Sequence, residues 1–411
     1  MNRGFIVTAL NGIRIIDLTR YVSGPFCTRQ LATMGAEIIK IEKPVSGDPS
    51  RNIEPFYNDQ PGIENSGLFM YLNMSKKGIT LDFKKPKGKD ILLELVETAD
   101  IVVENFRPTF LPKLNLSYED LKKVNPNLIM TSISNFGQTG PYRDFELTEI
   151  VMYAMGLTMN VTGLASREPQ KAALTVMQHQ AGSVAANATL GAYLGREIHG
   201  ISQHIDVSLL ETQLTSIDRT GAQLLGYQFS GSNPFQRFGD TAITILPMGV
   251  YPASDGYVMF VGAHPHWWPR FVKMIDRPDL FEDPRFQDSD YNFVYNLDYK
   301  EEFEGIILEW IIQKTKQEVM QEAQAAGMAG TAINSMADAI NDPQFNFRKF
   351  FVEIDHPTTG KIKYPGVPAH FTDIIPELKR APLLGEHNEE IYKKLGYDKN
   401  KLEELILEGV I

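Results

Sequence analysis

Cysteine is almost absent from this chain, because Cys27 is the only one among 411 residues. A lone cysteine excludes an intramolecular disulfide, and no group of cysteines and histidines has the spacing of a zinc site. The sequence therefore predicts a cytoplasmic protein without a structural metal. Long apolar runs are missing as well. No run approaches the ~18 residues of a membrane span, and residues 5–10 are too few for a signal-peptide core, so no membrane partner is expected.

Positive charge is also scarce, since 40 Lys and Arg face 51 Asp and Glu and give a formal net charge of -11 at pH 7. Nucleic-acid binding needs a surplus of cations, so no nucleic-acid partner is expected and any anion site must be local. The turn at 19–25 holds neither a G-x-G-x-x-G fingerprint nor a phosphate loop ending in Gly-Lys-Ser/Thr. A dinucleotide or nucleoside triphosphate site there is disfavoured.

Strand-like and helical patterns alternate through the first part of the chain. Short β-branched or apolar runs predict buried strands, and helical patterns lie between them. The predicted strands are 13–18, 36–42, 101–103, 128–133 and 203–210, with helices over 26–34 and 86–98. This alternation predicts an α/β fold with a doubly wound parallel sheet, whose ligands bind at the carboxyl ends of the strands. The length favours a second domain.

Small residues mark a central helix that runs from about Leu174 to Leu194. Ala181, Ala185 and Gly191 leave one helix face with little side chain, so another backbone can pack closely against it. The first turn of such a helix exposes backbone N–H groups and the positive end of the helix dipole, which suits an anionic side chain or substrate. The residue at this turn is Gln178, which is neutral and a poor nucleophile.

The second half of the chain changes character and predicts a smaller α+β domain. Short strands are expected over 243–263, and two stretches rich in turn residues, 44–67 and 215–240, are expected to be loops. Helices are expected near 267–274, 301–314, 318–326, 386–395 and 401–407. The basic stretch 73–85 is either a solvated charge run or, beside the predicted strand ends, a place for phosphates.

Five motifs in order resemble those of the family III coenzyme A-transferases, the group that includes formyl-CoA and carnitine CoA-transferases. They are LNGIRIIDLT (10–19), GAEIIKIE (35–42), VENFRP (103–108), FGQTGPY (136–142) and APLLGEH (381–387). The resemblance runs from residue 10 to residue 411, so it covers nearly the whole chain. It implies an enzyme of the CoA-transferase type, with a coenzyme A thioester as substrate and no tightly bound cofactor.

The same resemblance implies a Rossmann-like large domain built from both parts of the chain and an interlocked dimer. Its N-terminal part would span 1–212, with a linker over 213–240 and the small domain over 241–330. Residues 331–411 would form a second linker and the return to the large domain.

The resemblance also implies where coenzyme A would bind. The matching positions are Tyr21, Val22, Ser23, Lys43, Leu81, Lys84, Asn105, Phe106, Lys113 and Leu114. The three lysines would offset the charge of the CoA phosphates, which agrees with local basic patches in an acidic chain. Two departures concern this pocket: Ser75 stands where relatives usually have Asn, and the glycine-rich loop of formyl-CoA transferase is not recognisable around 230–233.

The chain departs from the family at the nucleophile. In the family an aspartate four residues before a glycine, at the start of the central helix, attacks the thioester and forms a mixed anhydride. Counting back from Gly182 gives Gln178, and an amide cannot form that anhydride. A shift of register does not supply a carboxylate, since there is no Asp or Glu between Glu168 and Glu197.

Two neighbours are weighed as replacements. Glu149 matches a position where relatives often carry an acid, and a structural or substrate-orienting role ranks above a nucleophilic one. His179 has the chemistry of a general base, although a lone histidine is more often a hydrogen-bonded packing residue. His264 and His266 have the spacing of one strand face, but no third ligand is near, so no metal site is expected.

These residues predict a CoA-transferase subunit that lacks the catalytic aspartate and pairs with a homologous subunit that has it. The two-subunit transferases that move CoA from succinyl-CoA to benzylsuccinate in anaerobic toluene degradation are the most similar kind. Two alternatives stay open: an acyl-CoA racemase or isomerase that uses His179 and Glu149, and a non-enzymatic chain that binds acyl-CoA.

Overall fold

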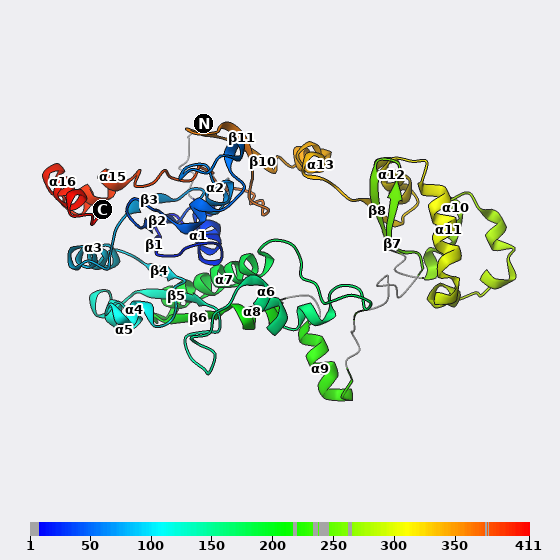
Figure 1. Ribbon diagram of the computed structural model, residues 1–411, viewed down its shortest axis with the longest axis horizontal. Coiled ribbons are helices and arrows are strands. Elements are labelled where there is room, and N and C mark those ends of the chain that lie inside the picture. The colour runs from blue at the N-terminus through cyan, green and yellow to red at the C-terminus, as the bar shows by residue number, and fades with distance from the viewer. Residues whose placement is uncertain are drawn as a thin grey trace. The chain divides into compact units, whose positions relative to one another are not determined.

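The computed structural model describes residues 8–216, 220–232, 237, 246–261, 265–374, 376 and 378–411 (Figure 1). The chain forms two compact units, each described by itself. The large unit comprises Met1–Met159, Lys171–Pro234 and Phe347–Ile411, and the small unit comprises Asn160–Gln170 and Phe235–Asn346. Within the described residues, no helix is both long enough and apolar enough to cross a membrane.

A parallel sheet of six strands forms the centre of the large unit. Its strands are β1 (Arg14–Asp17), β2 (Glu37–Glu42), β3 (Lys77–Thr80), β4 (Ile101–Glu104), β5 (Ile129–Ser134) and β6 (His204–Ser208). They lie in the order β3-β2-β1-β4-β5-β6, which confirms the predicted α/β class. The winding reverses between β1 and β4, so this pair marks the switch point of the sheet. β6 is shorter than predicted, because Ser208 accepts a hydrogen bond from the Glu211 N–H and the chain turns into a helix.

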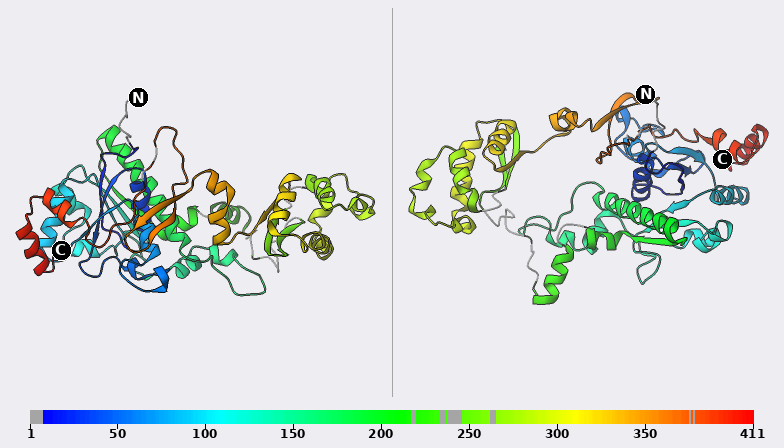
Figure 2. Two further views of the ribbon diagram at one scale, coloured as in Figure 1. Left: turned by 90° about the horizontal axis from the view of Figure 1, so that it is seen from above. Right: turned by 180° about the vertical axis from the view of Figure 1, so that it is seen from behind.

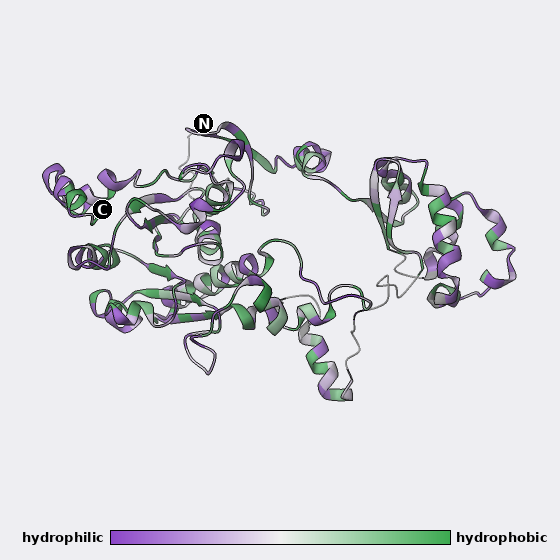
Figure 3. Cartoon of the chain, in the orientation of Figure 1, coloured by the Kyte–Doolittle hydropathy of each residue, from purple (hydrophilic) through white to green (hydrophobic). Residues whose placement is uncertain are grey.

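Helices cover both faces of this sheet (Figure 2). One face packs on α1 (Ser23–Thr33), α6 (Glu149–Met155) and α7 (Val176–His199). The other packs on α3 (Pro86–Glu97), α5 (Tyr118–Val124), α15 (Asn388–Lys394) and α16 (Lys399–Leu407). Figure 3 shows hydrophobic residues along the strands, while the outer helices α3 and α16 are largely hydrophilic. The remaining elements of the unit are α2 (Gly67–Leu72), α4 (Phe110–Lys113), α8 (Leu209–Ser216), α9 (Thr220–Ser230) and the antiparallel hairpin β10 (Phe351–His356) and β11 (Gly360–Pro365).

The predicted central helix is α7, and its small residues do bring another backbone close. Ala181 and Ala185 are fully buried on the face that packs against α1. A Cβ atom added at Gly182 would lie 2.5 Å from the carbonyl oxygen of Ser23. Glycine is therefore required at this crossing, because any side chain would push the first turns of the two helices apart. The helix ends at Gly200, which has a φ of +69°.

The two stretches that the sequence predicts as loops contain ordered structure. In 44–67, Asp48, Ser50 and Arg51 are buried, because their charges and hydrogen-bonding groups have partners inside the protein. The expectation of a surface loop is wrong there. In 215–240, α9 occupies 220–230, since this segment has no proline and no charged residue to interrupt a helix.

The small unit is an α+β structure with its own core. Its antiparallel sheet consists of β7 (Met248–Ala253), β8 (Gly256–Val261) and β9 (Ala329–Ala332). The helices are α10 (Trp268–Met274), α11 (Lys300–Ile311), α12 (Lys316–Ala325) and α13 (Met336–Asn341), and α14 (Pro343–Phe347) follows at the boundary of the unit. Trp268 is 3% exposed and its ring contacts those of Phe271, Phe286 and Phe303, so aromatic packing holds this core.

Candidate functional site

The residues predicted to bind coenzyme A lie on the loops at the carboxyl edge of the sheet. Each loop follows one of the strands β1 to β4, and parallel strands end at the same edge. Tyr21, Val22 and Ser23 follow β1, Lys43 follows β2, Leu81 and Lys84 follow β3, and Asn105, Phe106, Lys113 and Leu114 follow β4. The sequence motifs thus converge on one side of the molecule, on both sides of the switch point.

These residues divide into exposed and buried groups. Lys43, Lys84 and Lys113 are exposed, and Tyr21 is 48% exposed, so their side chains are available to a ligand. The others are buried or half-buried and shape the loops: Val22, Ser23, Leu81 and Phe106 are buried, and Asn105 and Leu114 are half-buried. The exposed members are mainly cations, which suits an anionic ligand.

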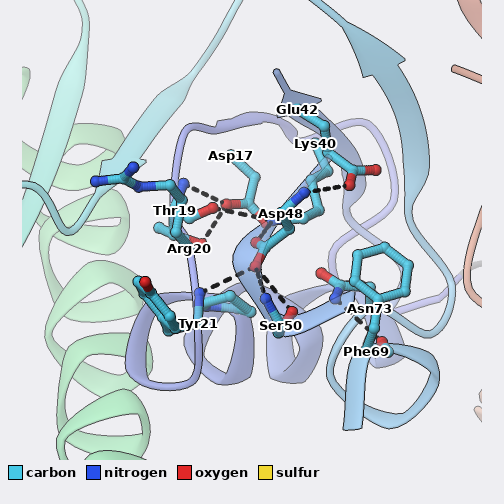
Figure 4. Close-up of polar contacts among 12 residues, drawn as sticks. Asp17, Thr19, Arg20, Tyr21, Lys40, Glu42, Asp48, Ser50, Phe69 and Asn73 are labelled. Carbon is cyan, nitrogen blue, oxygen red and sulfur yellow. Dashed lines mark hydrogen bonds and ion pairs between the residues drawn. The ribbon is translucent and has the colours of Figure 1, made fainter. Parts of the chain in front are cut away.

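A network of buried charges holds the loop after β1 in place (Figure 4). Asp17 accepts the backbone N–H of Thr19 at 2.9 Å. The Lys40 ammonium donates to the Thr19 carbonyl at 2.9 Å and to the Asp48 carboxylate at 2.8 Å. Asp48 in turn accepts the backbone N–H of Tyr21 at 3.2 Å. The backbone at Tyr21, with a φ of +64°, is therefore fixed by hydrogen bonds to charged groups.

Lys76 and Arg51 extend the network toward β2 and β3. The Lys76 ammonium donates to Asp17 at 3.0 Å and to the Asn73 side chain at 2.9 Å. Arg51 makes two hydrogen bonds to the Glu42 carboxylate, at 2.6 and 2.8 Å, and its guanidinium carbon lies 3.6 Å from the Phe69 ring centroid. Two parallel hydrogen bonds of this kind fix the relative orientation of two side chains as well as their separation.

The electrostatics of the network keep its members ionised. Burial opposes ionisation of Asp17, but Lys76 and Lys40 beside it lower the pKa of this carboxyl to about 2. Burial lowers the pKa of Lys76 to about 8, and the Asp17 carboxylate limits the fall. Near neutral pH both side chains of the pair are charged, so the loop is held by an ion pair and not by neutral groups.

The sequence reasoning missed this network, although the sequence carried a signal for it. Asp17 stands inside the apolar run 13–18, and Lys40 and Glu42 stand inside 36–42. Charged residues within strands that are covered on both faces are seldom tolerated without partners. Such residues could have been identified as buried ion pairs, although not which residues pair.

The loops after β1 and β4 are joined across the switch point. The side-chain amide of Asn105 accepts the Arg20 N–H at 2.8 Å and donates to the Arg20 carbonyl at 2.7 Å. Both polar groups of the amide are thus engaged by the backbone of one residue. The Arg20 guanidinium lies over the Phe106 ring, with 4.6 Å between its central carbon and the ring centroid. Arg20 was not identified from the sequence.

The first turn of α7 brings Gln178 and Glu149 together, as their predicted common site requires. Glu149 is the first residue of α6, and its Oε1 accepts the backbone N–H of Met177 at 2.8 Å. Its Oε2 accepts the side-chain N–H of Gln178 at 3.3 Å. A carboxylate of the chain itself therefore occupies the anion-binding end of α7, and the neutral amide beside it donates to that carboxylate.

His179 is held as a packing residue. Its Nδ1 lies 2.8 Å from the Thr175 carbonyl oxygen, which can only accept, so Nδ1 carries a proton. Its ring meets the Phe26 ring edge-on at 4.7 Å. Of the two other histidines weighed from the sequence, His264 lies outside the described residues. No group of acids, histidines and cysteines in the described part of the chain is arranged to hold a metal ion.

Comparison with known proteins agrees with this geometry. The model of CoA-transferase family III matches residues 10–388. The chain is 31% identical over 405 residues to the mouse succinyl-CoA:glutarate CoA-transferase, covering 98% of this chain and 90% of the relative. It is 30% identical over 395 residues to the succinyl-CoA--D-citramalate CoA-transferase of Chloroflexus aurantiacus, covering 94% of each.

A solved structure of a CaiB/BaiF family protein from Brucella suis superposes on the chain with a TM-score of 0.82 and 30% sequence identity, covering 94% of this chain and 99% of that one. The family predicted from the five sequence motifs is confirmed. The chain belongs to CoA-transferase family III, whose substrates are a coenzyme A thioester and a carboxylic acid.

Proposed function

We propose that this chain is the non-nucleophilic subunit of a cytoplasmic CoA-transferase and works in a complex with a homologous subunit that carries the catalytic aspartate. The observation that carries the proposal is the first turn of α7, where Gln178 stands at the position of the nucleophile and donates to Glu149. Acyl transfer through an anhydride needs a free carboxylate facing the thioester. This turn offers an amide instead.

Glu149 is poorly placed to replace the missing aspartate. One of its oxygens is bonded to the Met177 N–H and the other to the Gln178 amide. To attack a thioester it would have to give up both hydrogen bonds and leave the end of α7 without its anion. The racemase alternative fares no better, because it would need proton exchange by Glu149 and by His179, whose Nδ1 is bonded to Thr175.

A homologous partner is supported by the surface of α9. Its residues Leu225, Tyr227 and Phe229 are 54%, 57% and 84% exposed, and the helix has no charged residue. A helix of this kind is stable in water only when another chain covers it. The interlocked dimer of the family would provide that cover, and only one of its two chains would need to perform the chemistry.

The names of two relatives support succinyl-CoA as the donor. Both use succinyl-CoA, one with glutarate and one with D-citramalate, and both acceptors are dicarboxylic acids. Benzylsuccinate belongs to the same chemical class, so we propose it as the acceptor, in the anaerobic breakdown of an aromatic compound. The exposed lysines at the sheet edge fit the coenzyme A part that all such donors share.

The test is transfer of CoA from succinyl-CoA to benzylsuccinate, followed by chromatography of the thioesters. The chain purified alone is expected to show no transfer, and co-expression with a homologue that bears aspartate at the position of Gln178 restores it. A matched control changes that aspartate of the homologue to asparagine, which should abolish transfer. Transfer by the lone chain, with an acyl group trapped on Glu149, would contradict the proposal.

A further inference from the structure

Three aromatic rings form a platform at the edge where β3 and β4 end. Phe83 follows β3, Phe106 follows β4, and Phe110 begins α4. The ring centroids of Phe106 and Phe110 are 4.6 Å apart, and Phe83 lies 6.1 and 6.3 Å from them. Phe106 is only 6% exposed, so the platform is part of the packed core and its position is fixed.

Two cations lie over this platform. The central guanidinium carbon of Arg20 is 4.6 Å from the Phe106 centroid, and the Lys84 ammonium is 5.5 Å from the Phe110 centroid. Both side chains are exposed, and neither forms an ion pair with an acid in the described part of the chain. In a chain with a net charge of -11, unpaired cations on neighbouring rings are unusual. Attraction to the ring faces holds them there without neutralising their charge.

Arg20 is pre-organised to a degree that a surface arginine seldom is. Asn105 binds both its N–H and its carbonyl, so the backbone is fixed, and the Phe106 ring restricts the plane of the guanidinium. In Figure 4 its side chain extends away from the buried charge network, whereas the side chains of Asp48 and Lys40 point into it. A fixed planar guanidinium loses little entropy on binding and donates two parallel hydrogen bonds, the geometry that phosphate oxygens accept.

We propose that Arg20, together with Lys84, binds the phosphate groups of coenzyme A on the aromatic platform. This deepens the proposed function, because it rests on the CoA site at the carboxyl edge of the sheet. Arg20 is a binding residue that sets affinity for the nucleotide part of CoA, and Asn105 acts through it as a positioning residue.

The experiment measures CoA binding by calorimetry for Arg20→Gln, with Arg348→Gln as the matched control because Arg348 is an exposed arginine outside the site. Each variant is measured alone and in complex with the homologous subunit. Arg20→Gln should weaken CoA binding about tenfold and make it less dependent on salt, since hydrogen bonds to charged groups are lost. Arg20→Lys should lie between, because it keeps the charge but loses the planar fork.

Truncated ligands identify which phosphate Arg20 binds. If it binds the 3′-phosphate, dephospho-CoA binds Arg20→Gln and the unchanged chain equally. If it binds the diphosphate, dephospho-CoA still distinguishes them and pantetheine does not. Equal CoA affinity of Arg20→Gln and Arg348→Gln, or no CoA binding by the unchanged chain, would overturn the inference. Transfer assays on the same complexes test the proposed function separately.

Discussion

The loops after β1 to β3 and the first turn of α7 are held in different ways. The loops rest on buried ion pairs such as Arg51 with Glu42 and Lys76 with Asp17, all of them shielded from water. The turn of α7 is held by one half-buried carboxylate, Glu149, which accepts from a backbone N–H and from an amide. The binding edge is thus built more rigidly than the position where the family performs its chemistry.

This difference separates two tasks that family members usually combine. Rigid loops favour the binding of coenzyme A, because less entropy is lost when the ligand arrives. The α7 turn keeps the backbone geometry of the family but not its reactive group. A subunit that retains one and lacks the other fits a division of labour between two chains. The following experiments test how far the two regions differ.

The largest effect is expected from Arg51→Met, which leaves the Glu42 carboxylate buried without its partner. We expect a loss of about 3–5 kcal/mol in the free energy of unfolding of the large unit, measured by urea denaturation. Arg285→Met is the matched control, since Arg285 pairs with Glu302 at the surface and should cost at most about 1 kcal/mol. Similar losses in the two variants would refute the distinction between buried and exposed pairs.

Glu104 provides a contrast of a second kind, since it is as buried as Glu42 but has no arginine. Burial raises the pKa of Glu104 to about 7. A raised carboxyl pKa means that the folded state holds the proton more tightly, so this contribution is present below about pH 4 and is lost as pH rises through 7. Unfolding free energy should fall by roughly 3 kcal/mol from pH 4 to 8 through this group, and Glu104→Gln should remove that slope. An unchanged pH profile would count against it.

The crossing of α1 and α7 is expected to be nearly as sensitive. A methyl group at Gly182 would meet the Ser23 carbonyl, so Gly182→Ala should destabilise by about 1–3 kcal/mol. Gly191 on the same helix has nothing within 4 Å of an added Cβ. Gly191→Ala should therefore stabilise by up to about 1 kcal/mol, because alanine is the better helix former. Thermal unfolding of both variants checks this, and equal shifts in one direction would contradict the packing.

The smallest effect is expected at the α7 turn. Glu149→Gln keeps an oxygen for the Met177 N–H but removes the negative charge from the end of the helix. The loss should be about 0.3–1 kcal/mol, and it should shrink in high salt. Hydrogen exchange at the Met177 amide measures it locally. A loss as large as that of Arg51→Met would show that this turn is as tightly held as the loops.

Much of the fold could be predicted from the sequence because its signals are local. The strands β1, β2, β4 and β5 follow from short buried runs, and the small residues of α7 indicate its close packing against α1. The loops that carry the candidate site follow from the resemblance together with the rule for parallel sheets. The hairpin of β10 and β11 was missed, although its two strands are neighbours in the sequence.

The charge network could not be assembled from the sequence because its contacts are distant along the chain. Arg51 reaches Glu64 and the carbonyl of Pro382, and Lys76 reaches Asp17. A periodic pattern identifies which face of an element is apolar, but it does not identify which charges meet. For the same reason Arg20 was not recognised, since its importance depends on Asn105, 85 residues away.

The contact between Arg51 and Pro382 also has a consequence for biosynthesis. The two residues are 331 positions apart. At translation rates of 5–20 residues per second, a growing chain waits roughly 15 to 65 s before the second residue is made. The Tyr392 hydroxyl, which donates to the Thr80 carbonyl at 2.6 Å, arrives later still. A ribosome-bound chain therefore displays an unfinished sheet throughout synthesis, and chaperones that shield such surfaces should associate with it until the last helices emerge.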